Sequence, residues 1–169
     1  VLIKNAEALE VMEKIDTVVV DKTGTLTEGK PSLVSLIALG GFVDDELLRL
    51  AASLEQASEH PLGKAIVENA LKRDLRIPDV SEFNSITGMG VQGKVGGNKV
   101  ALGNLRLMEH LEINTAGLME ENAELLRQQG QTVMFLAVDQ QQAGLLGVAD
   151  PIKSSTPEAI RQLHDEGLK

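Results

Sequence analysis

One short segment combines the residue types that phosphoryl transfer requires. Asp21 opens the run Asp-Lys-Thr-Gly-Thr-Leu-Thr, directly after the β-branched segment 15–20. That segment is typical of a buried strand, so we expect the Asp21 carboxylate where a strand ends and a Gly/Thr turn begins. Ligands of open α/β sheets bind just beyond the carboxyl ends of the strands. An aspartate there can act as a nucleophile toward a phosphoryl group, and the turn can offer N–H groups and hydroxyls to the phosphate oxygens.

A second group of candidate residues surrounds a histidine. His60 lies in the string Ser-Glu-His-Pro-Leu (58–62), with Glu55 upstream. Pro61 suits the first position of a helix, which places His60 near the positive end of the helix dipole and disfavours the imidazolium form. A neutral imidazole is suited to stack on an adenine ring. The alternative is a histidine that only packs at a corner between two helices.

A third group consists of glycines. Gly88 and Gly90 lie in Thr-Gly-Met-Gly-Val (87–91), and Gly103-Asn104 follows later. Strand glycines often mark bulges or tight turns, so such a pair is weak evidence alone. With Gly93 the spacing also matches a dinucleotide-binding fingerprint, but that fingerprint must open a helix and a hairpin is predicted here. We therefore reject it.

Composition excludes several classes of protein. The net charge of −9 and the pI of about 4.8 disfavour a nucleic-acid partner, and the aromatic content of 2% disfavours base-stacking platforms. There is no cysteine, hence no disulfide or thiolate metal site. No apolar run approaches the ~20 residues that span a bilayer. Both ends look cut from a longer protein, of which this is a soluble piece.

Periodicity predicts strand-plus-helix ends around a middle rich in hairpins. Helices are expected over 6–13, 44–56, 61–73, a short stretch from Asn104 or Leu105, 115–129 and 157–166, and strands over 15–20, 32–39, 80–87, 91–95, 99–102, 132–138 and 143–148. Ser155 or Thr156 is expected to cap the last helix. The order predicts an α/β domain (1–31 and 146–169) with a second domain inserted (32–145), whose two ends lie close together.

Asp-Lys-Thr-Gly-Thr-Leu-Thr resembles the phosphorylation motif of P-type ATPases. The resemblance implies a partial haloacid-dehalogenase-like (Rossmann-like) phosphorylation domain with an inserted α+β nucleotide-binding domain of antiparallel sheet plus helix hairpins. It also implies that Asp21 attacks the γ-phosphate of ATP and, with the carbonyl of Thr23, binds Mg²⁺ in a site that is incomplete here. Lys22 and Thr25 would help hold the phosphoryl group.

Ser-Glu-His-Pro resembles the signature of the heavy-metal-transporting members of that family. The resemblance implies that the adenine site is lined by His60 and Glu55, and more loosely by Glu59. It extends the nucleotide pocket to Gly88, Gly90, Val91, Gly103 and Asn104. Asp150 and Lys153, in Asp-Pro-Ile-Lys, would orient the hinge between domains or reach the phosphates, although a plain loop salt bridge explains them equally well.

The resemblance also implies the setting of the whole protein. The segment Val-Leu-Ile-Lys-Asn-Ala-Glu-Ala-Leu-Glu (1–10) looks like the entry to the cytoplasm in copper-type pumps, which favours copper or silver export. This piece would then be a cytoplasmic part of an integral membrane protein, and missing membrane helices would carry the heavy-metal ion. Because the chain ends before the family's later phosphorylation-domain motifs, we expect it to bind ATP and ADP without phosphorylating itself.

Three alternatives stay open at this point. A zinc- or cadmium-type pump has a similar but less matching first segment. A soluble haloacid-dehalogenase-type phosphohydrolase usually carries a second aspartate, as general acid/base, at the position of Thr23. A threonine cannot replace that carboxylate, and a long-lived aspartyl-phosphate suits a pump better. The third alternative is a non-catalytic nucleotide-sensing module.

Overall fold

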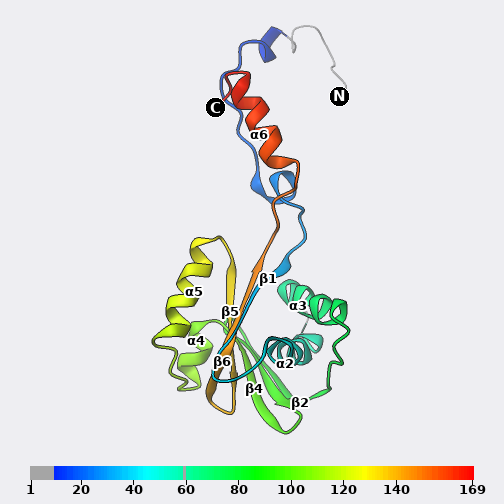
Figure 1. The fold of residues 1–169 in the computed structure, drawn as a ribbon, viewed down its shortest axis with the longest axis vertical. Coiled ribbons are helices and arrows are strands. Elements are labelled where there is room, and N and C mark those ends of the chain that lie inside the picture. The colour runs from blue at the N-terminus through cyan, green and yellow to red at the C-terminus, as the bar shows by residue number, and fades with distance from the viewer. Residues whose placement is uncertain (1–9, 59) are drawn as a thin grey trace. The chain divides into compact units, whose positions relative to one another are not determined.

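The computed structural model describes residues 10–58 and 60–169, which form two compact units (Figure 1). The smaller unit comprises the chain up to Lys30 together with Asp150–Lys169, and the larger one comprises Pro31–Ala149. The last strand of the larger unit continues to Ala149, beyond the expected domain end at residue 145. Each unit is described by itself.

Among the described residues of the larger unit, six strands form one antiparallel sheet in the order β1-β6-β5-β4-β3-β2. The strands are β1 (Ser32–Ala38), β2 (Val80–Ile86), β3 (Gly90–Val95), β4 (Asn98–Gly103), β5 (Thr132–Val138) and β6 (Gln141–Ala149). Sequence neighbours β2, β3 and β4 pair as a meander, and β5 pairs with β6 as a hairpin. The antiparallel sheet predicted for the inserted region is confirmed.

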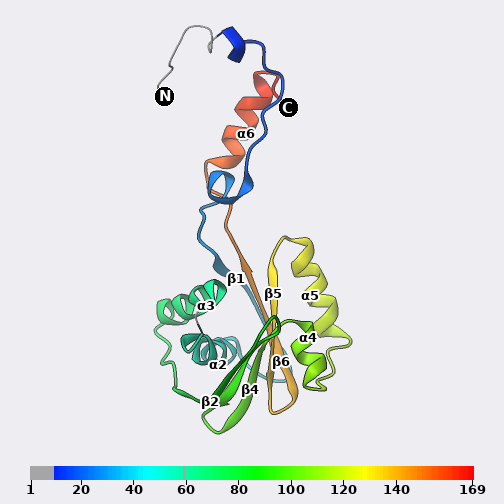
Figure 2. The same ribbon diagram turned by 180° about the vertical axis from the view of Figure 1, so that it is seen from behind.

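Helices cover both faces of the sheet (Figures 1 and 2). The helices α2 (Asp44–Gln56) and α3 (Pro61–Lys72) form a hairpin on one face, and α4 (Leu105–His110) and α5 (Leu118–Gln128) lie on the other. Because side chains alternate along a strand, both faces of β4 are apolar: Val100 and Leu102 pack into the first core, and Ala101 packs into the second.

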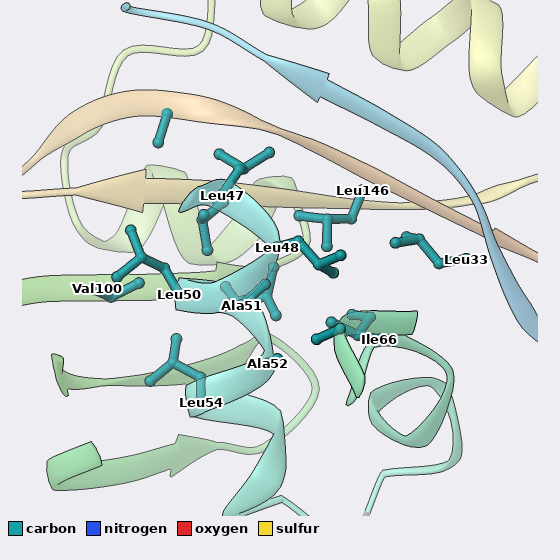
Figure 3. Close-up of a cluster of buried hydrophobic side chains, with 14 of the residues drawn as sticks. Leu33, Leu47, Leu48, Leu50, Ala51, Ala52, Leu54, Ile66, Val100 and Leu146 are labelled. Atoms are coloured by element: carbon teal, nitrogen blue, oxygen red, sulfur yellow. The ribbon is translucent and has the colours of Figure 1, made fainter. Parts of the chain in front are cut away.

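The first core is built mainly on α2. Three of its leucines, Leu47, Leu48 and Leu54, are completely buried. Figure 3 shows this cluster against the strands of the sheet, with Ile66 of α3 nearby. Leucine at helical spacing thus gives α2 an apolar stripe that faces the sheet.

The β3–β4 turn shows how local chemistry sets the register. Val95 pairs with Asn98, so Gly96 and Gly97 alone form the loop, with φ of 60° and 93°. Two positive φ values match the twist of a two-residue hairpin, and glycine adopts them without strain. The hairpin predicted at this position is confirmed.

Two local predictions need correction. The helix α5 begins at Leu118 rather than at 115, because Gly117 at its N-terminus has a φ of 85°, outside the helical region. The helix α6 (Thr156–Asp165) has no side-chain cap, since Ser155 makes no capping bond and the Thr156 hydroxyl donates instead to the carbonyl of Leu26. Of the helix predicted over 6–13, residues 6–9 lie outside the described residues, and residues 10–12 are helical as expected.

The prediction of a buried strand over residues 15–20 is wrong for the described chain. The segment is extended but belongs to no sheet, and the Val19 side chain is 94% exposed. Its backbone partner is Lys169, which accepts a hydrogen bond from Val18 and donates one to Asp16. The β-branched pattern was typical of a strand, but burial also requires neighbouring strands and helices, which the described residues of this unit do not supply.

Gly103 offers a test of how tightly β3, β4 and α4 pack. A Cβ at Gly103 would overlap the carbonyl oxygen of Met89 and lie 2.6 Å from Cδ2 of Leu107. We therefore expect Gly103→Ala to lower the free energy of unfolding by about 1–3 kcal/mol, measured by urea unfolding. Gly96→Asn is the control, because no atom lies within 4 Å of its Cβ position and asparagine tolerates a φ of 60°. Equal losses in both variants would contradict the packing argument.

Candidate functional site

A cleft of about 330 Å³ lies in the larger unit, at one end of the sheet. Its walls come from the α2–α3 joint, the β2–β3 turn, the end of β4 with the start of α4, and the start of β5. The cleft brings together seven residues predicted to bind nucleotide: Glu55, His60, Gly88, Gly90, Val91, Gly103 and Asn104. Four separate stretches of sequence therefore converge on one site.

The register of the sheet fixes which end carries the cleft. Thr132, in the wall of the cleft, pairs with Val148, and the next residue of β6, Ala149, pairs with Ser32. Ser32 and Ala149 are the first and last residues of β1 and β6, at the limits of this unit. The cleft thus lies at the end of the sheet where the chain enters and leaves the unit.

His60 has a defined orientation at the rim of the cleft. It is the N-cap of α3, and its Nδ1 accepts a hydrogen bond of 3.2 Å from the backbone N–H of Leu62. The backbone N–H of His60 donates a hydrogen bond of 3.2 Å to Oγ of Ser58. Because Nδ1 accepts the bond from Leu62, the ring N–H that can reach a ligand is the one on Nε2. The exposed ring is a flat surface in the cleft.

Glu55 brings a buried carboxyl group to the same end of the cleft. Only 5% of the residue is exposed, and its Oε2 has no hydrogen-bond partner among the described residues. Burial raises the pKa of Glu55 above its ordinary value of 4.5, while a hydrogen bond with Ser58 and the electrostatic interaction with His60 act in the opposite direction. A carboxyl group that is readily protonated can donate a hydrogen bond to a ligand as well as accept one.

The raised pKa of Glu55 predicts how stability depends on pH. The folded state binds the Glu55 proton more tightly than the unfolded state, so the stability from this group is complete below pH 4.5 and is lost as the pH rises through the folded pKa. We expect Glu55→Gln to raise the free energy of unfolding at pH 7 by about 1 kcal/mol, a gain that vanishes near pH 4.5. Thermal unfolding across this range measures it, with the exposed Glu68→Gln on α3 as control. A gain that persists unchanged at low pH would contradict the assignment.

The glycines of the cleft have two different structural roles. Gly90 and Gly103 pair across β3 and β4, and a Cβ on either one would overlap backbone atoms of the neighbouring strand or turn. Gly88 has a φ of 73° and nothing within 4 Å of its Cβ position, so its turn needs a positive φ and leaves open space. Asn104 fastens this corner, since its Nδ2 donates to the carbonyl of Gly88 at 2.8 Å and its Oδ1 accepts from the N–H of Leu107.

In the smaller unit, the segment Lys22–Leu26 forms a tight turn directly after Asp21. The hydroxyl of Thr27, which is 1% exposed, donates to the Asp150 carboxylate and accepts from the N–H of Gly24 at 3.0 Å. Asp150 also accepts from the N–H of Lys30 at 3.1 Å. Thr27 and Asp150 therefore fix the shape of the turn that presents Asp21.

Lys153 acts on the same turn. Its Nζ donates to the carbonyl of Gly24 at 2.8 Å, and its N–H donates to the carbonyl of Leu26 at 3.0 Å. These hydrogen bonds give Asp150 and Lys153 a structural role at the Asp21 turn. No salt bridge joins the two side chains, so the plain loop salt bridge given as an alternative is absent among the described residues.

The residues predicted to carry the chemistry are accessible. The side chains of Asp21, Lys22, Thr23 and Thr25 are all exposed on the turn. The Asp21 carboxylate and the Thr23 carbonyl are hard oxygen ligands of the kind Mg²⁺ prefers, which it supplements with water and substrate phosphates. No group of three or more acidic, histidine or cysteine residues that could hold a metal exists within the described range.

Sequence reasoning missed several residues of both sites. It gave Thr27 no role, although Thr27 closes the Asp21 motif and its burial organises the turn. It assigned no function to Ser58, which contacts His60, or to residues 132–134, which form one wall of the cleft. Only the pairing of β5 beside β4 brings that wall to the site, so no local signal could have found it. Glu59, predicted as a looser member of the adenine site, lies outside the described residues.

Comparison with known proteins places the chain in a family. Residues 15–169 match the haloacid dehalogenase-like hydrolases. The chain belongs to this family.

Two curated relatives show which kind of protein the chain is similar to. The chain is 54% identical, over all of its length, to a copper-transporting P-type ATPase of Rhizobium leguminosarum bv. viciae. It is 44% identical, again over its whole length, to a silver exporting P-type ATPase of Salmonella typhimurium. In each case it spans 20% of the relative's length.

A solved structure supports the same resemblance. A zinc-transporting PIB-type ATPase in its E2.Pi state matches 99% of this chain with a TM-score of 0.86 and 32% identity, and the match covers 27% of that protein. Among the helices that the structure describes, none is long and apolar enough to cross a membrane.

Proposed function

We propose that this chain is the nucleotide-binding and phosphorylation region of an ATP-driven heavy-metal pump that forms an aspartyl-phosphate on Asp21. The observation that carries the proposal is the convergence of the His60 corner and the Gly88–Gly90 turn on one cleft. The flat ring of His60 offers a stacking surface for adenine, and the Glu55 carboxyl group next to it can bond the polar edge of the base. Gly88 leaves room for the nucleotide to approach the backbone.

The proposed chemistry is a single phosphoryl transfer. A carboxylate oxygen of Asp21 forms a bond to the γ-phosphorus of ATP while the bond from that phosphorus to the bridging oxygen breaks, and ADP leaves with the electron pair. Lys22 and Thr25 would bind the transferred phosphoryl oxygens. Because Thr23 cannot activate water as a carboxylate would, the aspartyl-phosphate is expected to persist, as coupling to transport requires.

The turn supplies only some of the ligands that the implied magnesium ion requires. Asp21 and the carbonyl of Thr23 would hold it, and the ion would supply charge neutralisation for the phosphates. Every other ligand would come from water, nucleotide phosphates or residues outside this chain.

The transported ion is proposed to be copper or silver. The curated relatives named above carry those ions, at 54% and 44% identity, whereas the zinc-transporting protein is 32% identical in sequence. This ranking makes a zinc-type pump the second candidate. In the full-length protein the region would lie in the cytoplasm, and membrane segments would carry the ion.

Two assays on the 169-residue chain separate a pump fragment from a phosphohydrolase. We expect isothermal titration to detect ATP and ADP binding. We also expect hydrolysis of p-nitrophenyl phosphate to stay at background, because Thr23 occupies the position of the second carboxylate. Rapid hydrolysis of this ester without ATP binding would favour the phosphohydrolase instead.

A further inference from the structure

The cleft supplies no side-chain cation for a phosphate chain. Among the described residues that line it there is no lysine or arginine, and the acidic side chain of Glu55 lies at its His60 end. A nucleoside triphosphate carries several negative charges close together, which proteins usually bind with arginine or lysine. The base can therefore be accommodated here, but the phosphates need a cationic group beyond the cleft.

A second hollow adjoins the cleft on the side of α4 and α5. The two share Asn104, Thr132 and Val133, and the second has a volume of about 540 Å³. Two arginines line it, Arg106 from α4 and Arg127 from α5. The two hollows thus lie side by side at Asn104, within one unit of the protein.

The two arginines differ in the contacts that their side chains make. Arg127 is held in place, since its guanidinium lies 3.5 Å from Glu124 and 5.7 Å from the centre of the Phe135 ring. Arg106 is exposed and forms no ion pair with any residue in the part of the chain that the structure describes. Glu109, which also lines the hollow, is the opposing charge there. Arg106 is therefore the guanidinium that is available to a ligand.

We propose that Arg106 binds the phosphate chain of the nucleotide, with its base at His60 and its phosphates passing Asn104 into the second hollow. This inference rests on the proposed function and adds a residue that discriminates nucleoside triphosphates from nucleosides. The planar guanidinium can bond two phosphate oxygens at once. Glu109, three residues later on the same helix, repels those phosphates and moderates the affinity.

The test compares ligands that share a base and differ in phosphate. Binding of adenosine, AMP and ATP to the chain is measured by titration for the wild type and for Arg106→Ala, Glu109→Gln and Arg76→Ala. Arg76 is an exposed arginine of the same unit that lines neither hollow, so it controls for net charge. Alanine is a strong helix former, so α4 is expected to persist in Arg106→Ala.

We expect Arg106→Ala to weaken ATP binding about tenfold, since a charge-assisted bond to phosphate is lost. The affinity for adenosine should stay within about twofold of the wild-type value. Glu109→Gln should tighten ATP but not adenosine, and Arg76→Ala should change neither. Unchanged ATP affinity in Arg106→Ala, or an equal loss for adenosine, overturns the role of Arg106 while the cleft stands. A wild-type chain that binds none of the three ligands overturns the proposed function, and this inference with it.

Discussion

Replacing His60 with alanine is expected to weaken ATP binding by about tenfold to a hundredfold while the fold persists. The imidazole ring is exposed in the cleft and is oriented by the hydrogen bond that its Nδ1 accepts from the backbone N–H of Leu62, so it offers an adenine ring a fixed flat surface. Loss of base stacking on an aromatic residue costs about 1–3 kcal/mol, and 1.4 kcal/mol corresponds to a factor of ten in affinity. Titration calorimetry of the variant and the wild type with ATP measures the effect.

A second variant separates stacking from the capping role of His60. Alanine also removes the N-cap of α3, which costs about 1 kcal/mol of stability. Asparagine can accept the hydrogen bond from Leu62 but has no ring to stack. We therefore expect His60→Asn to retain the thermal stability of the wild type and to lose as much ATP affinity as His60→Ala. Full affinity in His60→Asn would show that only the cap matters, and His60 would leave the proposed adenine site.

Replacing Asp21 with asparagine is expected to abolish the acid-stable phosphoenzyme in the full-length protein. An amide cannot attack the γ-phosphorus as a carboxylate does, so incorporation of labelled phosphate from ATP should fall to background. The turn should survive, because no side-chain capping bond from Asp21 holds it and its shape depends on Thr27 and Asp150. Acid quenching followed by gel autoradiography detects the intermediate.

The control for this variant is another exposed carboxylate of the same unit. Asp16 lies at the start of the extended segment that leads to Asp21, and its side chain accepts a hydrogen bond only from the neighbouring Thr17 among the described residues. We expect the Asp16→Asn variant to incorporate as much labelled phosphate from ATP as the wild type does. Labelling that persists in Asp21→Asn would move the nucleophile to another residue.

The fold of the inserted region could be predicted because its signals are local. Pro61 starts α3 where the sequence predicted a helix, and Gly96-Gly97 forms the tight turn between β3 and β4. The helix predicted over 44–56 is observed as α2 with the same bounds. Each of these features is set by residues a few positions apart, and tertiary packing agrees with them.

Features that depend on distant residues could not be read in the same way. The β-branched segment 15–20 looked like a buried strand, but burial depends on the neighbours that a segment finds. The cleft wall at Thr132 exists only because β5 lies between β4 and β6. Thr27 needed the distant Asp150 to reveal its role. For the candidate site, sequence identified the residues at the corners, and only the structure placed them around one hollow.

The central claim is that adenine nucleotide occupies the cleft at the end of the sheet. An ATP titration of the isotope-labelled chain, followed by amide NMR, tests it most directly. We predict the largest shift changes at Gly88, Gly90, Val91, Gly103 and Asn104, all in the wall of the cleft. Changes centred instead on the separate hollow that contains Lys94 and Lys99, with the cleft amides unmoved, would contradict the account.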